Sequence, residues 1–239
     1  YNLQLGAEKQ HAFKFMAGMN RVTNKWSSSK GTINDLIDLE NPQFPFAVGD
    51  QFFEGDRNWE SQLGFFGRLN YAFEDKYFLE ANIRRDGSSK FPDHLKWKWF
   101  PSFSAGWVFT SEEFMKPIEN ILSFGKFRAS WGSIGDQTVS NTLYKSVLEG
   151  GQSTWLGGNG NKLPLFGTPT LVDSDISWQQ IETLDFGIDL RFFNNKFGVT
   201  FDWYRRDTKD MLVGGESLPV TLGTTAPVGN YGSLRTKGW

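Results

Sequence analysis

Residues 184–206 read LDFGIDLRFFNNKFGVTFDWYRR, and on both sides of Asn194-Asn195 every second residue is apolar. Asparagine tolerates the backbone angles of tight hairpin turns, so a two-residue reversal at this pair is expected. The reversal pairs Phe192 with Phe197, Leu190 with Val199, Ile188 with Phe201 and Phe186 with Trp203. The interleaved positions carry Asp185, Asp189, Arg191, Asp202, Tyr204 and Arg206. The stretch therefore predicts a hairpin with one apolar face and one charged face.

The same alternation returns along the rest of the chain, where helical periodicity is scarce. It is found in segments 13–19, 63–73, 77–83, 97–109 and 127–131. These segments predict strands throughout, and hence an all-β, antiparallel protein. In the hairpin the apolar face extends from Leu184 to Phe192, about nine residues, which is the length that a tilted strand needs to cross a bilayer.

The composition narrows the possible functions. A net charge of −2 argues against a nucleic-acid binder, and the lack of cysteine excludes disulfides and thiolate chemistry. His11 and His94 stand in no metal-binding spacing, so no metal site is expected. No run of about 18 apolar residues encodes a transmembrane helix, but a barrel hides its membrane signal in alternation. Because the chain starts at Tyr1 without a signal peptide, we expect a piece of a longer protein.

The expected connections between strands alternate in length. They are short near Glu8 to His11, at 74–76 and at Asn194-Asn195, and mostly long at roughly 21–62, 87–96, 133–177 and 208–227. Outer-membrane barrels have short periplasmic turns and long extracellular loops. Segment 110–121 falls on the short side, where one helical turn capped by Thr110 or Ser111 is expected. Counted in this way the chain holds about eight strands and begins a ninth near Val228.

Two other architectures share part of this pattern. A soluble carbohydrate-binding β-sandwich also alternates, because one face of each sheet lies in a dry core. A small outer-membrane barrel, acting as an adhesin or anchor, closes with about eight strands on a filled interior. Four glycines would face that interior and fill little of it: Gly64, Gly106, Gly132 and Gly187. Aromatic residues near strand ends, long strands and alternating loop lengths favour a segment of a larger barrel.

No catalytic constellation is evident. Asp185 and Asp189 lie on one strand face roughly 13 Å apart, beyond the about 5 to 9.5 Å of glycoside hydrolysis. They are expected to join a hydrated charge ladder with Arg191, Asp202 and Arg206. Residues 132–135 lack the spacing of a nucleophile elbow, and residues 157–160 match no phosphate-binding loop. We therefore expect neither an enzyme nor a cofactor.

Five segments carry a resemblance to a known family. They are GRLNYAFEDKYFLEANIRRDGSSKF (67–91), FPSFSAGWVFTSEEFMK (100–116), FRASWGSIGDQ (127–137), TLDFGIDLRFFNNKFGVTFDWYRRDTKDML (183–212) and NYGSLRTKGW (230–239). Together, in this order, they resemble the barrel region of the SusC/RagA family of TonB-dependent outer-membrane transporters. The resemblance implies that residues 1–239 are part of one TonB-dependent receptor β-barrel domain. The whole barrel would be larger and plugged, and the plug and N-terminal extension would be absent from this chain.

The resemblance also implies a function and its partners. Members import oligosaccharides or peptides across the outer membrane of Bacteroidetes, beneath a SusD-like surface lipoprotein and driven by the TonB complex. Residues 77–83 are then expected to face lipid, and Gly87 to open the loop 86–89 with a positive φ. The residues expected to face the lumen are Glu80, Arg84, Asp185, Asp189, Arg191, Asp202 and Arg206.

Substrate contacts are expected in the long loops, where indoles stack on sugars or peptide side chains and amides form hydrogen bonds. The candidates are Trp26 and Trp59 in the first long loop and Trp155, Asn159 and Asn161 in the 133–177 loop. The alternative interpretation is that these tryptophans only pack the loops over the barrel or against the lipoprotein.

Overall fold

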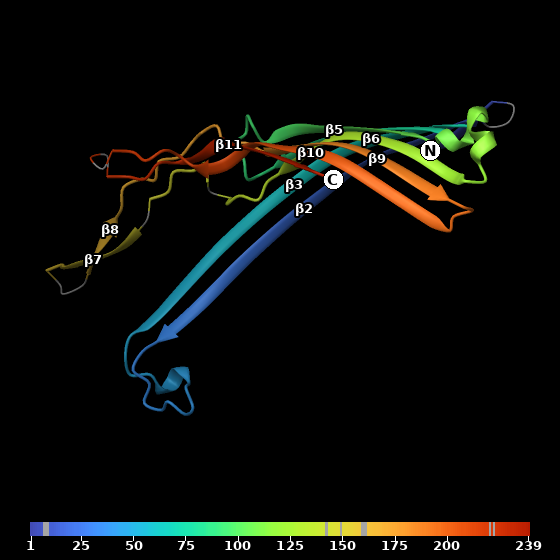
Figure 1. Cartoon of the computed structure of the whole chain (residues 1–239). Helices are drawn as coiled ribbons and strands as arrows, with labels where there is room; N and C mark the ends of the chain where they lie inside the picture. The colour runs from blue at the N-terminus through green and yellow to red at the C-terminus, as the bar shows by residue number, and fades with distance from the viewer. Residues whose placement is uncertain (7–9, 142, 149, 159–161, 220, 222) are drawn as a thin grey trace.

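The computed structural model describes residues 1–6, 10–141, 143–148, 150–158, 162–219, 221 and 223–239, and most of them lie in one curved sheet (Figure 1). Nine antiparallel strands follow the order β1-β2-β3-β4-β5-β6-β9-β10-β11. They are β1 (Asn2–Leu5), β2 (His11–Ile33), β3 (Gln51–Phe73), β4 (Tyr77–Ser88), β5 (Trp97–Trp107), β6 (Leu122–Asp136), β9 (Gln179–Phe192), β10 (Phe197–Gly214) and β11 (Val228–Gly238). Strands β7 (Gly150–Leu156) and β8 (Lys162–Phe166) pair separately. The predicted all-β, antiparallel architecture is confirmed.

The hairpin of β9 and β10 has the predicted register. Phe192 lies opposite Phe197, Leu190 opposite Val199, Ile188 opposite Phe201 and Phe186 opposite Trp203. The turn is wider than the expected two-residue reversal, because residues 193–196 separate the last strand pair. Phe193, Asn194 and Asn195 in it all have positive φ, between 51° and 65°. The Lys196 N–H donates to the Phe192 carbonyl at 3.0 Å and closes the turn. The wider turn leaves the pairing of the strands unchanged.

Register is continuous across the sheet, so each row of cross-strand neighbours shares one face. One row contains Phe15, Leu69, Ala81, Phe103, Trp131 and Leu184. The adjacent row, on the other face, contains Lys14, Asn70, Glu80, Ser104, Ser130 and Asp185. We call the face of the first row the apolar face and that of the second the polar face.

Among the described residues, no second layer of structure covers the apolar face. Leu79, Phe103 and Phe201 are each more than half exposed although they stand within strands. The buried apolar cluster is small and consists of Phe91, Phe100, Ile176 and Trp178. Among the described residues, β1 and β11 occupy opposite edges of the sheet and do not pair with each other. A single open layer is neither a sandwich nor a small closed barrel.

Connections of two lengths lie at the two ends of the sheet, as predicted. Segments 74–76 and 193–196 are short turns at the end that also carries the β5–β6 connection (Figure 1). The opposite end, which we call the loop end, carries the connections 34–50, 89–96, 137–178 and 215–227.

The expected loop at 21–62 is wrong in extent. Strands β2 and β3 continue through most of it as a two-stranded ribbon that leaves the sheet, paired as far as Ile33 and Gln51 (Figure 1). The 3₁₀-helix η1 (Phe44–Phe46) lies in the connection at its tip. Arg21, Thr23 and Lys25 stand where the apolar series from Phe13 to Met19 would continue, because a ribbon that leaves the sheet needs no apolar face.

Gly87 does not have the expected positive φ. It lies inside β4, opposite Trp97, and it is buried. A Cβ at this position would collide with the Trp97 indole. Glycine is therefore required here for the close approach of an aromatic ring, and β4 continues to Ser88 instead of ending at Arg85.

The β5–β6 connection contains two 3₁₀-helices, η2 (Phe109–Ser111) and η3 (Glu113–Ile118). The expected side-chain cap is absent: the Thr110 hydroxyl instead accepts from the Gly125 N–H at 2.9 Å. Glu112 accepts hydrogen bonds from the Tyr77 hydroxyl at 2.6 Å and the Trp107 indole at 3.2 Å. These bonds lower the pKa of Glu112. In the described residues no helix has the length and apolar character to cross a bilayer.

Acidification is expected to loosen this connection. The pKa of folded Glu112 lies below its usual 4.5, so its bonds stabilise the folded connection above that pH and are lost as the pH falls through the folded pKa. Hydrogen exchange of the 108–121 amides, corrected for intrinsic rates, should rise in the wild type from about pH 6 to about pH 3. Glu112→Gln keeps an acceptor and does not titrate, so its protection should change much less. Equal responses of the two proteins would contradict this prediction.

A cation on the apolar face should be far more costly than one on the polar face. Phe201→Lys in the full-length protein is expected to lower the free energy of unfolding from lipid vesicles by about 2–4 kcal/mol. Thr200→Lys is the matched control, since Thr200 lies one position away on the polar face and bonds Asp189 at 3.1 Å. Equal losses in the two variants, measured by urea titration, would show that the two faces meet the same medium.

Candidate functional site

The polar face carries all seven residues expected to face the lumen. Register places Glu80 and Asp185 in one row, with Ser104 and Ser130 between them. Arg206 lies opposite Thr183 and Thr236. The full set on this face is Glu80, Arg84, Asp185, Asp189, Arg191, Asp202 and Arg206. That the polar face lines a lumen remains a prediction.

Arg128 on β6 is the centre of the strongest charged network on this face. Its Nε and Nη2 donate to the two Asp189 oxygens at 2.7 and 3.2 Å, and Nη2 also reaches Asp202 at 2.8 Å. The Thr200 hydroxyl donates to Asp189 at 3.1 Å. These side chains are 27% to 42% exposed, so water screens the ion pairs. The network positions two carboxylates on one guanidinium.

Sequence reasoning missed Arg128, although a signal for it existed. Phe127, Ala129 and Trp131 are one of the alternating segments, which puts Arg128 on the charged side of that strand. The expected charge ladder contains Arg191 and Arg206 instead. In the structure the Arg191 guanidinium lies over the Phe124 ring, 5.5 Å from its centroid. Only the pairing of β6 with β9 shows which arginine meets Asp189.

Glycines on the polar face make room for these charged side chains. Gly187 lies between Arg128 and Asp202 in the same row, and a Cβ there would collide with both side chains. A Cβ at Gly64 would likewise meet the side chains of Asn20, Arg84 and Asp86. The space in front of these glycines is therefore occupied by neighbouring polar groups, which the glycine pattern alone did not reveal.

A second set of polar contacts crosses β2, β3 and β4. The Arg84 guanidinium donates to Asn20 at 3.1 Å and forms an ion pair with Asp86. Asn82 donates to Glu80 at 2.7 Å. Beside these contacts, the polar face is hollowed into a concavity of about 630 Å³, lined among others by Lys14, Asn70, Glu80, Lys126, Arg128 and Asp185. The arrangement provides charges of both signs beside an open concavity.

The tryptophans expected in the loops lie elsewhere and do not form one site. Trp26 belongs to β2 and Trp59 to β3, in the ribbon beyond the sheet. Trp26 lies opposite Asn58 and Trp59 opposite Lys25, which places the two indoles on opposite faces of the ribbon. Trp155 belongs to β7, in the small separate sheet, and is 78% exposed. Asn159 and Asn161 lie outside the described residues.

Loop-end contacts hold the base of the ribbon. The Asn141 amide donates to the Asn58 side chain at 2.7 Å and to the Trp59 carbonyl at 2.9 Å. Glu60 accepts from Asn24 at 2.9 Å and pairs with Lys90 at the same distance. The buried cluster of Phe91, Phe100, Ile176 and Trp178 joins the neighbouring loops. Trp59 is thus held at its backbone while its indole is 61% exposed.

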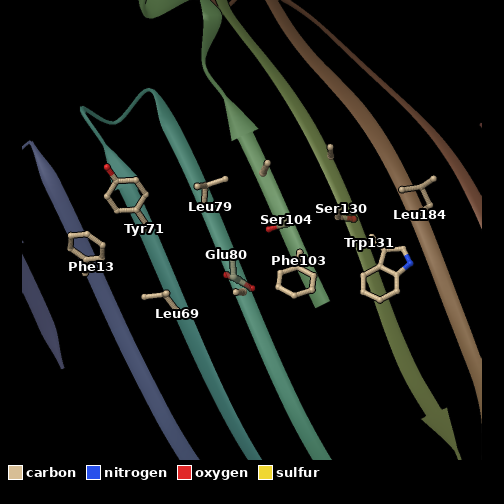
Figure 2. Close-up of a pocket in the computed structure, with 13 residues that line it drawn as sticks. Phe13, Leu69, Tyr71, Leu79, Glu80, Phe103, Ser104, Ser130, Trp131 and Leu184 are labelled. Atoms are coloured by element: carbon tan, nitrogen blue, oxygen red, sulfur yellow. The ribbon is translucent and has the colours of Figure 1, made fainter. Parts of the chain in front are cut away.

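The apolar face forms shallow grooves where small residues interrupt the large ones. One groove has a volume of about 620 Å³. Leu69, Tyr71 and Phe103 are among its lining residues (Figure 2). Ala81, Ala105 and Ala129 also line it. Within the described part of the chain, no three histidine or carboxylate side chains gather as metal ligands would. The grooves therefore offer apolar contact and no evident chemistry.

Comparisons with known proteins agree with this geometry. A family model described as "TonB dependent receptor-like, beta-barrel" matches residues 1–239. TonB-dependent receptor P26 of Formosa agariphila is 36% identical over 177 residues, which are 73% of this chain and 17% of that protein. TonB-dependent receptor SusC of Bacteroides thetaiotaomicron is 31% identical over 184 residues, 74% of this chain and 18% of that protein. The chain thus spans less than a fifth of these relatives.

Solved structures have the same fold. The structure of the RagAB peptide transporter superposes on 100% of this chain and 26% of its own chain, with a TM-score of 0.79 and 21% identity. The siderophore receptor PirA from Acinetobacter baumannii covers 99% of this chain with a TM-score of 0.54 and 14% identity. The fold and its two faces define a segment of a membrane-spanning β-barrel. The chain belongs to the TonB-dependent receptor family, and its resemblance to the SusC/RagA transporters is confirmed.

Removal of Arg128 should destabilise the barrel modestly. Arg128→Met leaves the Asp189 and Asp202 carboxylates close together without their shared cation, and solvent screening limits the expected loss to about 1 kcal/mol. Arg206→Met on the same face is the control, because threonines flank Arg206 across both strands. Unfolding by urea in vesicles at low and high salt measures the difference. Equal losses of stability in the two variants would contradict a structural role for the network. So would an Arg128→Met variant that is as stable as the wild type at low salt.

Proposed function

We propose that this chain is part of the barrel wall of an outer-membrane importer. In this proposal the polar face lines the lumen around a plug contributed by another part of the protein, and the apolar face contacts lipid. Residues 1–239 would form one portion of a single TonB-dependent receptor barrel domain. The transported nutrient would be an oligosaccharide or a peptide, and the TonB complex would supply energy through an N-terminal part of the protein.

The single layer with two unlike faces is the observation that carries the proposal. A sheet whose apolar face is uncovered is stable only when another apolar medium covers it. The apolar face of β9 extends from Leu184 to Phe192, a length that suits a tilted membrane strand. The opposite face has paired charges and a hollow, as a hydrated passage requires.

A surface lipoprotein is the proposed partner at the loop end. The likeness of this chain to SusC and to the RagAB transporter supports a SusD-like lipoprotein as a lid over the barrel. The long ribbon of β2 and β3 and the β7–β8 sheet project at this end and offer exposed indoles (Figure 1). Trp26, Trp59 and Trp155 are proposed to contact either the nutrient or the lid, and Asn159 and Asn161 remain proposals for the same role.

Uptake by cells tests this proposal. A strain lacking the full-length gene should lose energised accumulation of labelled oligosaccharide mixtures or of labelled peptide mixtures, and the wild-type gene should restore it. Accumulation should also stop when a protonophore collapses the proton gradient. Restored uptake that survives the protonophore, or a protein that fractionates away from the outer membrane, would contradict an energised outer-membrane importer.

Binding measurements test the proposed indole contacts separately. Trp59→Ala and Trp155→Ala in the intact transporter should each weaken nutrient binding about threefold to tenfold, since an aromatic contact contributes about 0.5–1.5 kcal/mol. Trp131→Ala on the apolar face is the control and should leave binding unchanged. Unchanged binding in the two loop-end variants would remove these residues as nutrient contacts and leave contact with the lid as their role.

A further inference from the structure

Arg85 is a cation without an ionic partner among the described residues, and it lies at the loop-end edge of the apolar face. It lies in a row with Met19, Phe65 and Trp99, and the next two rows toward the short turns are apolar. Arg205, which lies on the same face, has a carboxylate partner in Asp207 at 3.3 Å. Arg85 makes neither a hydrogen bond nor an ion pair with any described residue. Its charge is therefore available to a group outside the chain.

Two indoles hold the Arg85 guanidinium in place. Its Cζ lies 5.2 Å from the ring centroid of Trp97 and 5.3 Å from that of Trp99. Trp97 is itself positioned over Gly87 and stacks on Phe65 at 6.2 Å between centroids. Stacking on aromatic faces leaves the N–H edge of a guanidinium free for two parallel hydrogen bonds to an anion.

An apolar groove begins directly beside Arg85 on the same face. It has a volume of about 600 Å³ and lies over the next two rows of the sheet. Its lining includes Phe15, Ala17, Gly67, Leu69, Ala81, Ile83, Pro101 and Phe103. Gly67 and the two alanines form its floor, and larger residues flank it. Leu69, Ala81 and Phe103 also line the groove of Figure 2, so the two grooves are continuous along the sheet.

We propose that Arg85 and this groove bind a phosphorylated lipid of the outer leaflet, with its phosphate on the guanidinium and an acyl chain in the groove. The inference rests on the proposed function, because that function puts the apolar face in lipid and the loop end outside the cell. At the outer surface of the bilayer, the acyl chains of a lipid end at its anionic head group. A lone cation at the end of an apolar groove is complementary to that arrangement, and a planar guanidinium matches phosphate oxygens.

Native mass spectrometry of the intact, delipidated transporter tests the proposal, with monophosphoryl lipid A as the probe. Arg85→Gln should weaken binding of the probe about tenfold, the usual effect of losing one charge-assisted hydrogen-bonded contact. Arg205→Gln is the matched control, since Arg205 lies on the same face but is already paired with Asp207. Equal weakening in the two variants would show that the probe responds to the overall surface charge and not to Arg85, and it would overturn the proposal.

The groove is tested by Gly67→Leu. A Cβ at Gly67 makes only ordinary contacts, 3.8 Å from the Ile83 side chain, so the fold should tolerate the change while the side chain fills the groove. We expect this variant to lose the probe as strongly as Arg85→Gln does. Millimolar inorganic phosphate should not displace the probe from the wild type. Displacement by phosphate alone, or full binding to Gly67→Leu, would contradict an acyl-chain site.

The two proposals fail separately. A transporter that accumulates nutrient normally but binds no lipid A, in the wild type as in the variants, would overturn the lipid site and leave the importer intact. A protein that does not reside in the outer membrane would overturn the proposed function, whatever it binds in detergent.

Discussion

Pairing of the backbone within one sheet is the constraint on which the rest of this structure depends. In lipid, no water is present to satisfy amide and carbonyl groups, so each strand must bond its neighbours. An antiparallel ladder achieves this, and its side chains then alternate strictly between two faces. The continuous register from β2 to β10 keeps the two faces separate over seven strands. The side chains of one face can therefore contact lipid while those of the other face form ion pairs.

The polar face shows how charges are kept on a sheet without a core. Arg128 serves two aspartates, and Gly187 provides the space that lets its side chain reach Asp202. Partial exposure to water keeps the cost of burying these charges low, and the pairing restricts their positions. The apolar face uses small residues differently, since glycine and alanine there open grooves along the surface. Glycine thus makes room for ion pairs on the polar face and opens grooves on the apolar face.

The sequence predicted the fold where local rules decide it. The β9–β10 register follows from a period of two around Asn194-Asn195, and the faces follow from the same period. The extent of β2 and β3 could not be predicted, because a ribbon in water has no apolar alternation to mark it. The partner of Asp189 could not be predicted either, since the pairing of β6 with β9 crosses a long connection. The role of Gly87 could not be predicted, because the aromatic ring that requires a glycine there, Trp97, comes from another strand.

The most direct test of the two-faced sheet is a spin-label scan along residues 184–191 of the full-length protein in lipid vesicles. This chain contains no cysteine, so a single label can be introduced at each position once any cysteines elsewhere are replaced. Positions 184, 186, 188 and 190 should be accessible to oxygen dissolved in lipid, and positions 185, 187, 189 and 191 to a water-soluble nickel complex. An alternation of period two in this phase is the predicted result. Uniform accessibility, or the opposite phase, would contradict a sheet with its apolar face in lipid.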